Sequence, residues 1–239
     1  MRYLALACDY DGTLAADGRV GDETVAALER LRVSGRKLIL VTGRELNDLF
    51  SVFSHTQLFD WVVAENGALL YQPSGREEKV LGERPPEAFI QALRDRGVQP
   101  LSAGRVIVAT WRPHETAVLD VIAELGLEFQ VIFNKGAVMV LPPGIDKATG
   151  LAAVLKELGL SAHHVVGIGD AENDHAFLSL CGCAVAVANA LPALKERADF
   201  VTRADHGAGV AELIDELIAT DLCAREQKRG RGSFPDRAR

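Results

Sequence analysis

Short apolar runs alternate with amphipathic stretches from the N-terminus of this chain. Three of the runs have the length and composition of buried strands: YLALACD (3–9), KLILVT (37–42) and WVVAEN (61–66). Between the first two, apolar residues recur three positions apart at Val25, Leu28 and Leu31, as on one face of a helix. A second helical stretch precedes the third run. This alternation predicts a parallel sheet with helices on both faces, the three-layer α/β/α arrangement of Rossmann-like folds.

The pattern changes after residue 66, where strand signals outnumber helical ones. Residues 67–81 predict a hairpin that turns at Pro73-Ser74-Gly75. The pattern that follows predicts helices at 86–96 and 114–125, and strands at 105–111, 127–133 and 137–142. We interpret residues 83–141 as a small α+β domain inserted into the parallel one, and we name this segment the cap.

The strand–helix rhythm returns after the cap. It predicts helices at 147–158, from 173, at 192–197 and at 209–219, and strands at 165–170, 183–188 and 200–202. The expected core domain therefore consists of residues 1–82 and 142–222.

The composition is that of an ordinary globular enzyme, with 48% hydrophobic and 25% charged residues among 239. The net charge of −7 argues against a core that binds nucleic acid. We expect a cytoplasmic protein, because no apolar run reaches the length of a membrane span and the N-terminus lacks the pattern of a signal peptide. The spacing of the four cysteines is not that of a zinc site, so we interpret them as structural thiols.

The C-terminal segment 223–239 differs from the rest in charge. From residue 224 on it contains six Lys or Arg and two acidic residues, a local +4 that leaves −11 on the remainder. It has no hydrophobic periodicity. We expect a disordered tail, or a linker to a further domain or partner.

Polar residues end four of the predicted strands. Asp9, Thr42, Glu65-Asn66 and Asp170 each follow an apolar run directly. In open α/β sheets ligands bind outside the carboxyl ends of the strands, where the strand order reverses. We therefore expect these distant residues to meet at one edge of the sheet.

The pair Asp9 and Asp11, in DYDGT, suits phosphoryl transfer. If Asp9 attacks phosphorus, the neighbouring carboxylate can protonate the leaving oxygen and later deprotonate water. The alternative is a turn in which the aspartates cap the end of the strand.

A carboxylate that approaches a phosphate dianion meets repulsion of roughly 4 kcal/mol per pair of unit charges at about 4 Å, so cations are needed. Mg²⁺ prefers oxygen ligands, and Asp170, Asp9 and the backbone carbonyl of Asp11 would supply them. Asp174 follows one turn later, as a further ligand or a support. The alternative is that Asp170 and Asp174 only cap the next helix.

Lys147 and Thr42 would complete such a site. Lys147 begins a predicted helix, where its ammonium would neutralise both the nucleophile and the phosphate. Thr42, before Gly43, offers a hydroxyl and a backbone N–H to a phosphoryl oxygen. Taken alone, Lys147 would be interpreted as a surface lysine, and Thr42 as a residue that caps the N-terminus of a helix. We assign Glu45, His163, His164 and His206 to surface or capping positions.

These segments, in this order, resemble the motifs of the haloacid dehalogenase (HAD) superfamily: DYDGT (9–13), Thr42 in VTGR, Lys147 in GIDK and GDAEND (169–174). The inserted segment, with ENGA (65–68), is similar to the Cof-type subclass IIB. The resemblance implies that Asp9 is the nucleophile and Asp11 the acid/base. It assigns the metal to Asp9, Asp11, Asp170 and Asp174, and phosphate binding to Thr42, Gly43, Lys147 and Asn173.

The predicted function is a Mg²⁺-dependent phosphatase of a small phosphorylated metabolite, a sugar phosphate or related phospho-acid, that acts through an aspartyl phosphate. The alternatives are a phosphomutase or phosphotransferase of the same superfamily and a non-catalytic regulatory module. Because the core motifs contain little that would recognise a leaving group, we expect that role for polar or aromatic residues near turns and strand ends: Asn66, Arg105, Trp111, Arg112, Asn134 and Lys135. The alternative for each cap residue is an ordinary surface position.

Overall fold

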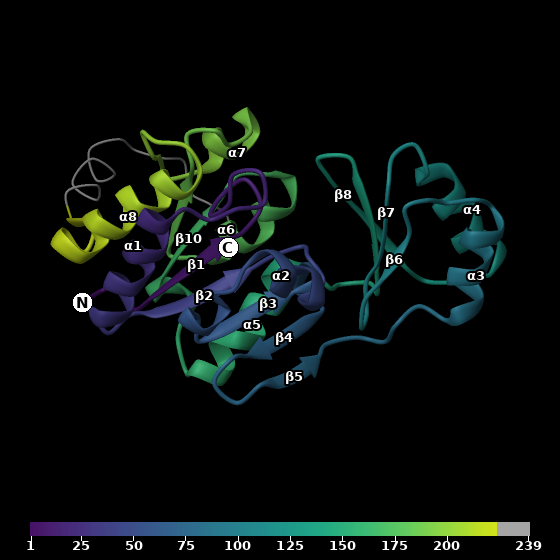
Figure 1. The fold of residues 1–239 in the computed structure, drawn as a ribbon, viewed down its shortest axis with the longest axis horizontal. Coiled ribbons are helices and arrows are strands. Elements are labelled where there is room, and N and C mark those ends of the chain that lie inside the picture. The colour runs from purple at the N-terminus through teal and green to yellow at the C-terminus, as the bar shows by residue number, and fades with distance from the viewer. Residues whose placement is uncertain (224–239) are drawn as a thin grey trace, which may run out of the picture.

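An eight-stranded sheet forms the centre of the core in this computed structural model, which describes residues 1–223 (Figure 1). Its six parallel strands, in spatial order, are β12 (Phe200–Val201), β11 (Cys183–Ala186), β10 (Val165–Gly169), β1 (Ala5–Asp9), β2 (Lys37–Val41) and β3 (Trp61–Ala64). The hairpin of β4 (Leu69–Gln72) and β5 (Glu77–Val80) adds two antiparallel strands beside β3. The predicted parallel sheet is thus confirmed, with an antiparallel edge.

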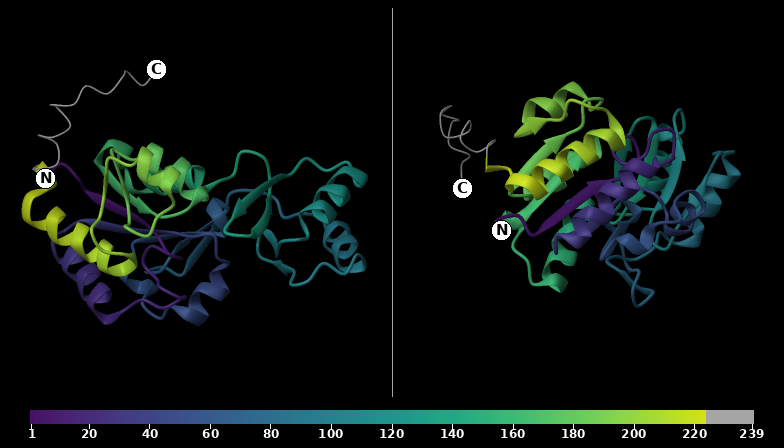
Figure 2. Two further views of the ribbon diagram at one scale, coloured as in Figure 1. Left: turned by 90° about the horizontal axis from the view of Figure 1, so that it is seen from above. Right: turned by 60° about the vertical axis from the view of Figure 1, so that its left-hand side comes forward.

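Helices cover both faces of this sheet and make the core three-layered (Figure 2). On one face α1 (Asp22–Val33) packs against α8 (His206–Thr220), and on the other α5 (Lys147–Leu158) packs against α6 (His175–Leu180). The remaining helices of the core are α2 (Leu46–Val52), α7 (Pro192–Arg197) and the 3₁₀ helices η1 (Thr56–Leu58), η2 (Glu65–Gly67), η3 (Ala162–His164) and η4 (Glu172–Asp174).

The position of each strand follows from its residues. Every residue of β1 is buried, as in a parallel strand with helices above and below it. All four residues of β5 are exposed, and the charged sequence EEKV protects this free edge from pairing with another chain. The chain order reverses at β1, because β2 lies on one side of it and β10 on the other. The carboxyl end of β1 is therefore the expected place for a ligand.

The cap is a second lobe beside the core (Figures 1 and 2). Its antiparallel sheet has the order β6 (Ser102–Ala103), β7 (Val108–Trp111), β9 (Ala137–Leu141) and β8 (Gln130–Asn134). The helices α3 (Glu87–Asp95) and α4 (Glu115–Glu124) pack on this sheet around a separate apolar cluster that contains Phe89, Val118 and Val138. A further cluster joins the lobes, because it combines Ala68 and Ile145 with Val106, Ile107, Met139 and Leu141.

Of the predicted strands that the structure shortens, two lie at the junction of core and cap. The strand expected at 61–66 ends at Ala64, because Glu65 and Asn66 adopt left-handed backbone angles, with φ of 50° and 54°. The strand expected at 105–111 begins only at Val108, because the backbone before it is held by Glu65 of the core. Both deviations place polar groups of η2 at the junction of core and cap.

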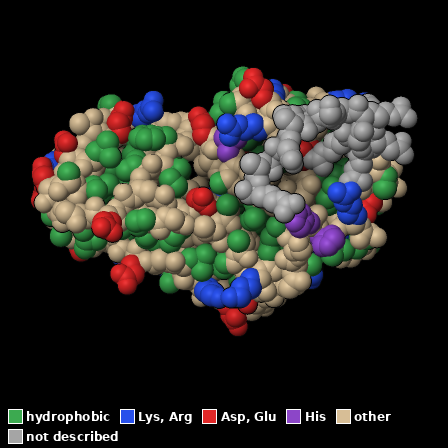
Figure 3. Space-filling view, turned by 180° about the vertical axis from the view of Figure 1, so that it is seen from behind, with side chains coloured by type: hydrophobic (Ala, Val, Ile, Leu, Met, Phe, Trp, Pro, Cys, Tyr) green, Lys and Arg blue, Asp and Glu red, His purple; other side chains and the backbone are tan. Residues whose placement is uncertain are grey.

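Acidic and basic side chains lie on both lobes of the face shown in Figure 3. Within residues 1–223, no helix combines the length and the apolar character that crossing a bilayer requires. The basic segment from residue 224 onward lies outside the described residues.

Candidate active site

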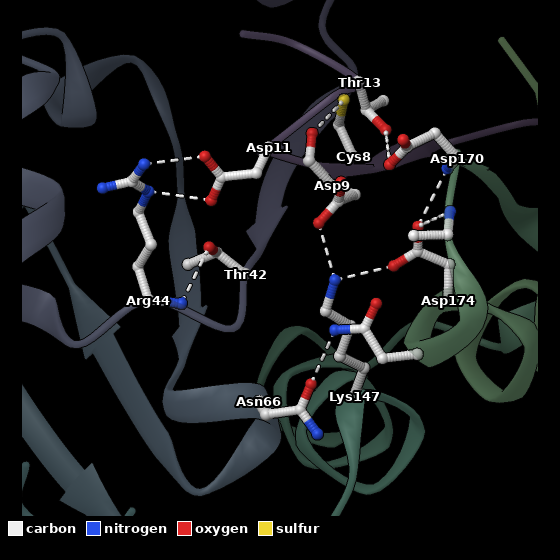
Figure 4. A network of polar contacts seen from close by, with 12 residues as sticks. Cys8, Asp9, Asp11, Thr13, Thr42, Arg44, Asn66, Lys147, Asp170 and Asp174 are labelled. Atoms are coloured by element: carbon white, nitrogen blue, oxygen red, sulfur yellow. Dashed lines mark hydrogen bonds and ion pairs between the residues drawn. The ribbon is translucent and has the colours of Figure 1, made fainter. Parts of the chain in front are cut away.

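Three buried aspartates and one buried lysine meet at the carboxyl end of β1 (Figure 4). Lys147 Nζ donates to Asp9 Oδ1 and to Asp174 Oδ1, with both distances 2.6 Å. One oxygen from each of Asp9, Asp170 and Asp174 lies within 4.8 Å of the others. The structure therefore brings together four of the residues that the sequence predicted for the site.

The parallel register positions the aspartates. Asp9 is the last residue of β1, and Asp170 directly follows β10, whose Ile168 pairs with Cys8. Asp174 then binds back to the same loop, because its Oδ2 accepts the N–H groups of Asp170 at 2.8 Å and Ala171 at 3.0 Å. Asp174 thus lies in the carboxylate cluster and ties down the loop after β10, while its side chain makes no capping hydrogen bond to α6.

Lys147 is the first residue of α5, and its position depends on the hydrogen bonds that fix the N-terminus of that helix. The Asp146 side chain accepts from Thr149 N at 2.8 Å, while Thr149 Oγ1 accepts from Asp146 N at 2.9 Å. This reciprocal pair fixes where the helix begins. The ammonium is consequently directed into the protein, and the surface reading of Lys147 is wrong, because only 1% of its side chain is exposed.

Burial and like charge control the ionisation of the cluster. Burial raises the pKa of Asp9 well above the ordinary carboxyl range, and the charge of Asp174 adds to this, while Lys147 opposes it. Burial lowers the pKa of Lys147, but Asp174 and Asp9 outweigh it, so this pKa lies above its usual value and the side chain stays an ammonium. Within the buried cluster Lys147 contacts two of the three carboxylates, Asp9 and Asp174, so its charge does not balance all three.

The donor set fits a divalent cation. Carboxylate oxygens are the ligands that Mg²⁺ prefers, and three of them converge here with negative charge left over. Thr13 Oγ1 donates to Asp170 Oδ1 at 3.3 Å and so helps to orient this carboxylate. Gly12, with φ of 87°, passes so close to Asp170 Oδ2 that any Cβ there would clash with this carboxylate.

Asp11 lies apart from this cluster in the structure. Its carboxylate forms a bidentate ion pair with Arg44. The Nε atom of Arg44 lies 2.8 Å from Asp11 Oδ2, and Nη2 lies 2.8 Å from Asp11 Oδ1. Figure 4 shows the Asp11 side chain turned toward Arg44 and away from Lys147. Arg44 also binds Asp48 at 2.6 Å. The sequence reasoning missed Arg44, although it is the last residue of the VTGR motif that singled out Thr42.

Thr42, Gly43, Asn66 and Asn173 form a polar wall beside the aspartates. Thr42 is fully buried, and its Oγ1 accepts from Arg44 N at 3.1 Å. Asn173 Nδ2 donates to Asn66 Oδ1 at 2.9 Å, and a Cβ on Gly43 would lie within 4.0 Å of both amides. The Oδ1 atom of Asn173 is buried without a hydrogen-bond partner among the described residues. The wall thus joins the ends of β2, β3 and β10, as predicted.

The cap residues predicted for specificity lie in different surroundings. Arg105 pairs with Glu78 at 3.0 Å on the outside of the junction, Trp111 is 52% exposed, and the guanidinium of Arg112 lies over the ring of Phe133. The Oδ1 atom of Asn134 is buried without a partner among the described residues. Lys135 is the one of the five cap candidates with a hydrogen bond to the aspartates, 2.5 Å from Asp170 Oδ2.

Glu65 was expected at the ligand-binding edge of the sheet but without a role, and the structure shows that it connects the core to the cap. Its buried carboxylate accepts three backbone N–H groups of the cap, those of Arg105 at 2.8 Å, Val106 at 2.8 Å and Ile107 at 2.9 Å. Gly104 permits this approach, because a Cβ there would lie 2.5 Å from Glu65 Oε1. The only sequence signal was the position of Glu65 at a strand end beside Asn66.

We expect Glu65→Ala to loosen the cap. The substitution leaves three backbone N–H groups without an acceptor, two of them on buried residues, at a cost of about 1–3 kcal/mol each. Amide hydrogen exchange at residues 105–107 should become at least about tenfold faster. The matched control is Glu77→Ala, which removes an exposed glutamate from β5. Unchanged exchange at 105–107 in the Glu65 variant would contradict the proposed connection.

His206 and Asn189 hold the loop that follows β1. Both contact the carbonyl oxygen of Gly12, His206 through Nδ1 at 3.0 Å and Asn189 through Nδ2 at 2.8 Å. His206 is the first residue of α8, whose N-cap is Asp205, so the residue does not cap this helix and instead supports the DYDGT turn.

Comparison with known proteins agrees with this geometry. The sequence matches the haloacid dehalogenase-like hydrolase family over residues 6–101 and 133–214. A phosphoglycolate phosphatase from Methanothermobacter thermautotrophicus is 34% identical over 222 residues, which is 90% of this chain and 98% of that protein. Phosphoglycolate phosphatase 2 from Saccharolobus solfataricus is 31% identical over 90% of this chain and 93% of that protein. Among solved structures, a HAD/COF-like hydrolase from Plasmodium vivax aligns with a TM-score of 0.76 and 21% identity, covering 92% of this chain and 96% of that one.

Proposed function

Because the chain belongs to the haloacid dehalogenase-like hydrolase family, we propose that it releases phosphate from phosphoglycolate, a small phospho-acid, with Mg²⁺ as its cofactor. The chain is a phosphatase, the activity named for relatives that align with nearly their full length. The observation that carries the proposal is the buried contact of Lys147 with Asp9 and Asp174, beside Asp170. It gives a nucleophile, a fixed cation and the ligands of a divalent ion in one place.

In this proposal Asp9 is the nucleophile. Lys147 holds its Oδ1, which leaves Oδ2 to attack phosphorus while the bond to the leaving oxygen breaks. The ammonium offsets the repulsion between the carboxylate and the incoming phosphate. Asp9, Asp170 and the backbone carbonyl of Asp11 would hold Mg²⁺, which would supply further positive charge near the phosphoryl oxygens.

Asp11 transfers the protons. It protonates the leaving alkoxide in the first step, and in the second it takes a proton from the water that attacks the phosphoaspartate, so that Asp9 and phosphate are released. This role requires the Asp11 side chain to turn from Arg44 toward Asp9. The wall formed by Thr42, Gly43, Asn66 and Asn173 would hold the phosphoryl oxygens through hydroxyl, amide and backbone donors.

The substrate is tested by a panel of phosphorylated metabolites. We expect kcat/KM for phosphoglycolate to exceed that for hexose phosphates by at least about tenfold, with phosphate release lost in EDTA and restored by Mg²⁺. Phosphate released should equal substrate consumed. Substrate loss without phosphate would instead indicate transfer to a second hydroxyl, and a preference for a sugar phosphate would contradict the proposed substrate.

A further inference from the structure

Lys135 stands at the tip of the β8–β9 hairpin of the cap. Asn134 pairs with Ala137, so Lys135 and Gly136 form a two-residue turn, with φ of 47° and 93°. Turns with two positive φ angles favour Asn and Gly, and a long side chain at such a position is strained. Strained backbone positions are concentrated at active sites and ligand contacts. The turn itself does not require a lysine, so we look to its ammonium for the reason that lysine stands at position 135.

The ammonium of Lys135 reaches one of the three clustered aspartates. Its Nζ atom lies 2.5 Å from Asp170 Oδ2 and 3.5 Å from the backbone oxygen of Asp11. The Asp170 side chain is 2% exposed, while that of Lys135 is 43% exposed, so the lysine approaches the buried carboxylate from the open side. The oxygens it contacts belong to two of the groups that we propose as ligands of Mg²⁺.

A charge balance shows what this contact does. In the fully ionised form that binds a cation, the three carboxylates and Lys147 leave a charge of −2 in the cluster, and Lys135 reduces it to −1. A divalent ion bound by Asp9, Asp170 and the backbone carbonyl of Asp11 would neutralise this −2 without Lys135. Two cations at the same carboxylate oxygen repel each other, the more strongly in a buried site. The ion and the ammonium thus compete for Asp170.

We infer that Lys135 competes with the divalent ion for Asp170 and, when the ion is bound, turns its ammonium to the carboxylate of the substrate's leaving group. The second part rests on the proposed function. In phosphoglycolate one carbon separates the ester oxygen from the carboxylate, so a cation that reaches Asp170 also reaches a carboxylate whose phosphate lies at Asp9. A cap residue thereby supplies the recognition that the core lacks.

Metal affinity tests the first part without any turnover. Mn²⁺ is titrated calorimetrically into metal-stripped wild-type protein and into Lys135→Met and Lys135→Asn. The asparagine variant also suits the left-handed turn, so agreement between the two variants identifies charge as the cause. We expect both to bind Mn²⁺ about tenfold more tightly than wild type. Arg94→Met, which removes an exposed cation of the cap paired with Glu87, should bind like wild type. Equal affinity in wild type and both Lys135 variants overturns the competition.

Leaving-group preference tests the second part. Phosphoglycolate is compared with 2-hydroxyethyl phosphate, which carries a hydroxymethyl group in place of the carboxylate, at saturating Mg²⁺. Lys135→Met should lower kcat/KM for phosphoglycolate about tenfold or more and that for 2-hydroxyethyl phosphate less than about twofold. Equal losses for both substrates overturn the carboxylate contact. If wild type does not hydrolyse phosphoglycolate, the proposed function fails and this part falls with it, while the Mn²⁺ titration still decides the competition for Asp170.

Discussion

Asp9→Asn is expected to reduce phosphate release by at least about 10⁴-fold. Asparagine keeps the size of the side chain and can still accept the hydrogen bond of Lys147 at Oδ1. Its neutral amide oxygen, however, is not a nucleophile toward phosphorus. Phosphate release from phosphoglycolate, or from the generic ester p-nitrophenyl phosphate, measures the loss.

The stability of this variant should not fall with its activity. Burial raises the pKa of Asp9, which means that its ionised form destabilises the folded protein near neutral pH. Removing that charge in metal-free protein should leave the melting temperature equal or higher. Asp120→Asn removes an exposed carboxylate from α4 of the cap and should change neither quantity. Turnover above about 1% of wild type in Asp9→Asn would exclude the covalent mechanism.

The sequence predicted the core well because its physical signals are local. An apolar run followed by an acidic residue identifies both a buried parallel strand and its carboxyl end, as at Asp9 and Asp170. Parallel pairing then brings such ends to one edge of the sheet, so the meeting of Asp9 and Asp170 could be anticipated from strand order alone.

Contacts that depend on side-chain direction could not be predicted in this way. Glu65 and Asn66 read as the end of a strand, yet left-handed backbone angles turn them toward the cap and the site. The ion pair of Asp11 with Arg44 joins the loops that follow β1 and β2. The hydrophobic periodicity of the sequence does not indicate how far these loops extend beyond the sheet. Nothing in the sequence favoured Lys135 over the donors Arg105 and Arg112. Only the position of the β8–β9 hairpin beside the core brings Lys135, and not the two arginines, to Asp170.

Lys147→Met should cost both activity and stability. Methionine fills nearly the same volume but carries no charge, so the incoming phosphate meets Asp9 without its fixed cation, and turnover should fall at least about 10³-fold. Asp9 and Asp174 would remain buried without the ammonium that both now contact at 2.6 Å. Loss of one partner of a buried ion pair destabilises the folded state by about 3–5 kcal/mol. Urea unfolding of metal-stripped protein at pH 8 measures this loss.

The pH dependence of that loss separates a charge effect from a packing effect. Burial and Asp174 raise the pKa of Asp9 while Lys147 lowers it, so removing the lysine moves this pKa further above the ordinary value of about 4. A carboxyl whose pKa is higher in the folded state binds more protons when folded, and its folded state loses stability as the pH rises from about 4 to the raised pKa. In wild type the pKa of Asp9 is about 8, so up to that pH the two proteins lose stability in parallel. The stability difference between wild type and Lys147→Met should therefore grow above about pH 8 and be larger at pH 9 than at pH 5. Lys156→Met, on the exposed face of the same helix, should change stability by less than about 0.5 kcal/mol at either pH. A difference that is equal at both pH values would show that Lys147 stabilises the core by packing, and that the charge of Asp9 is balanced by other groups.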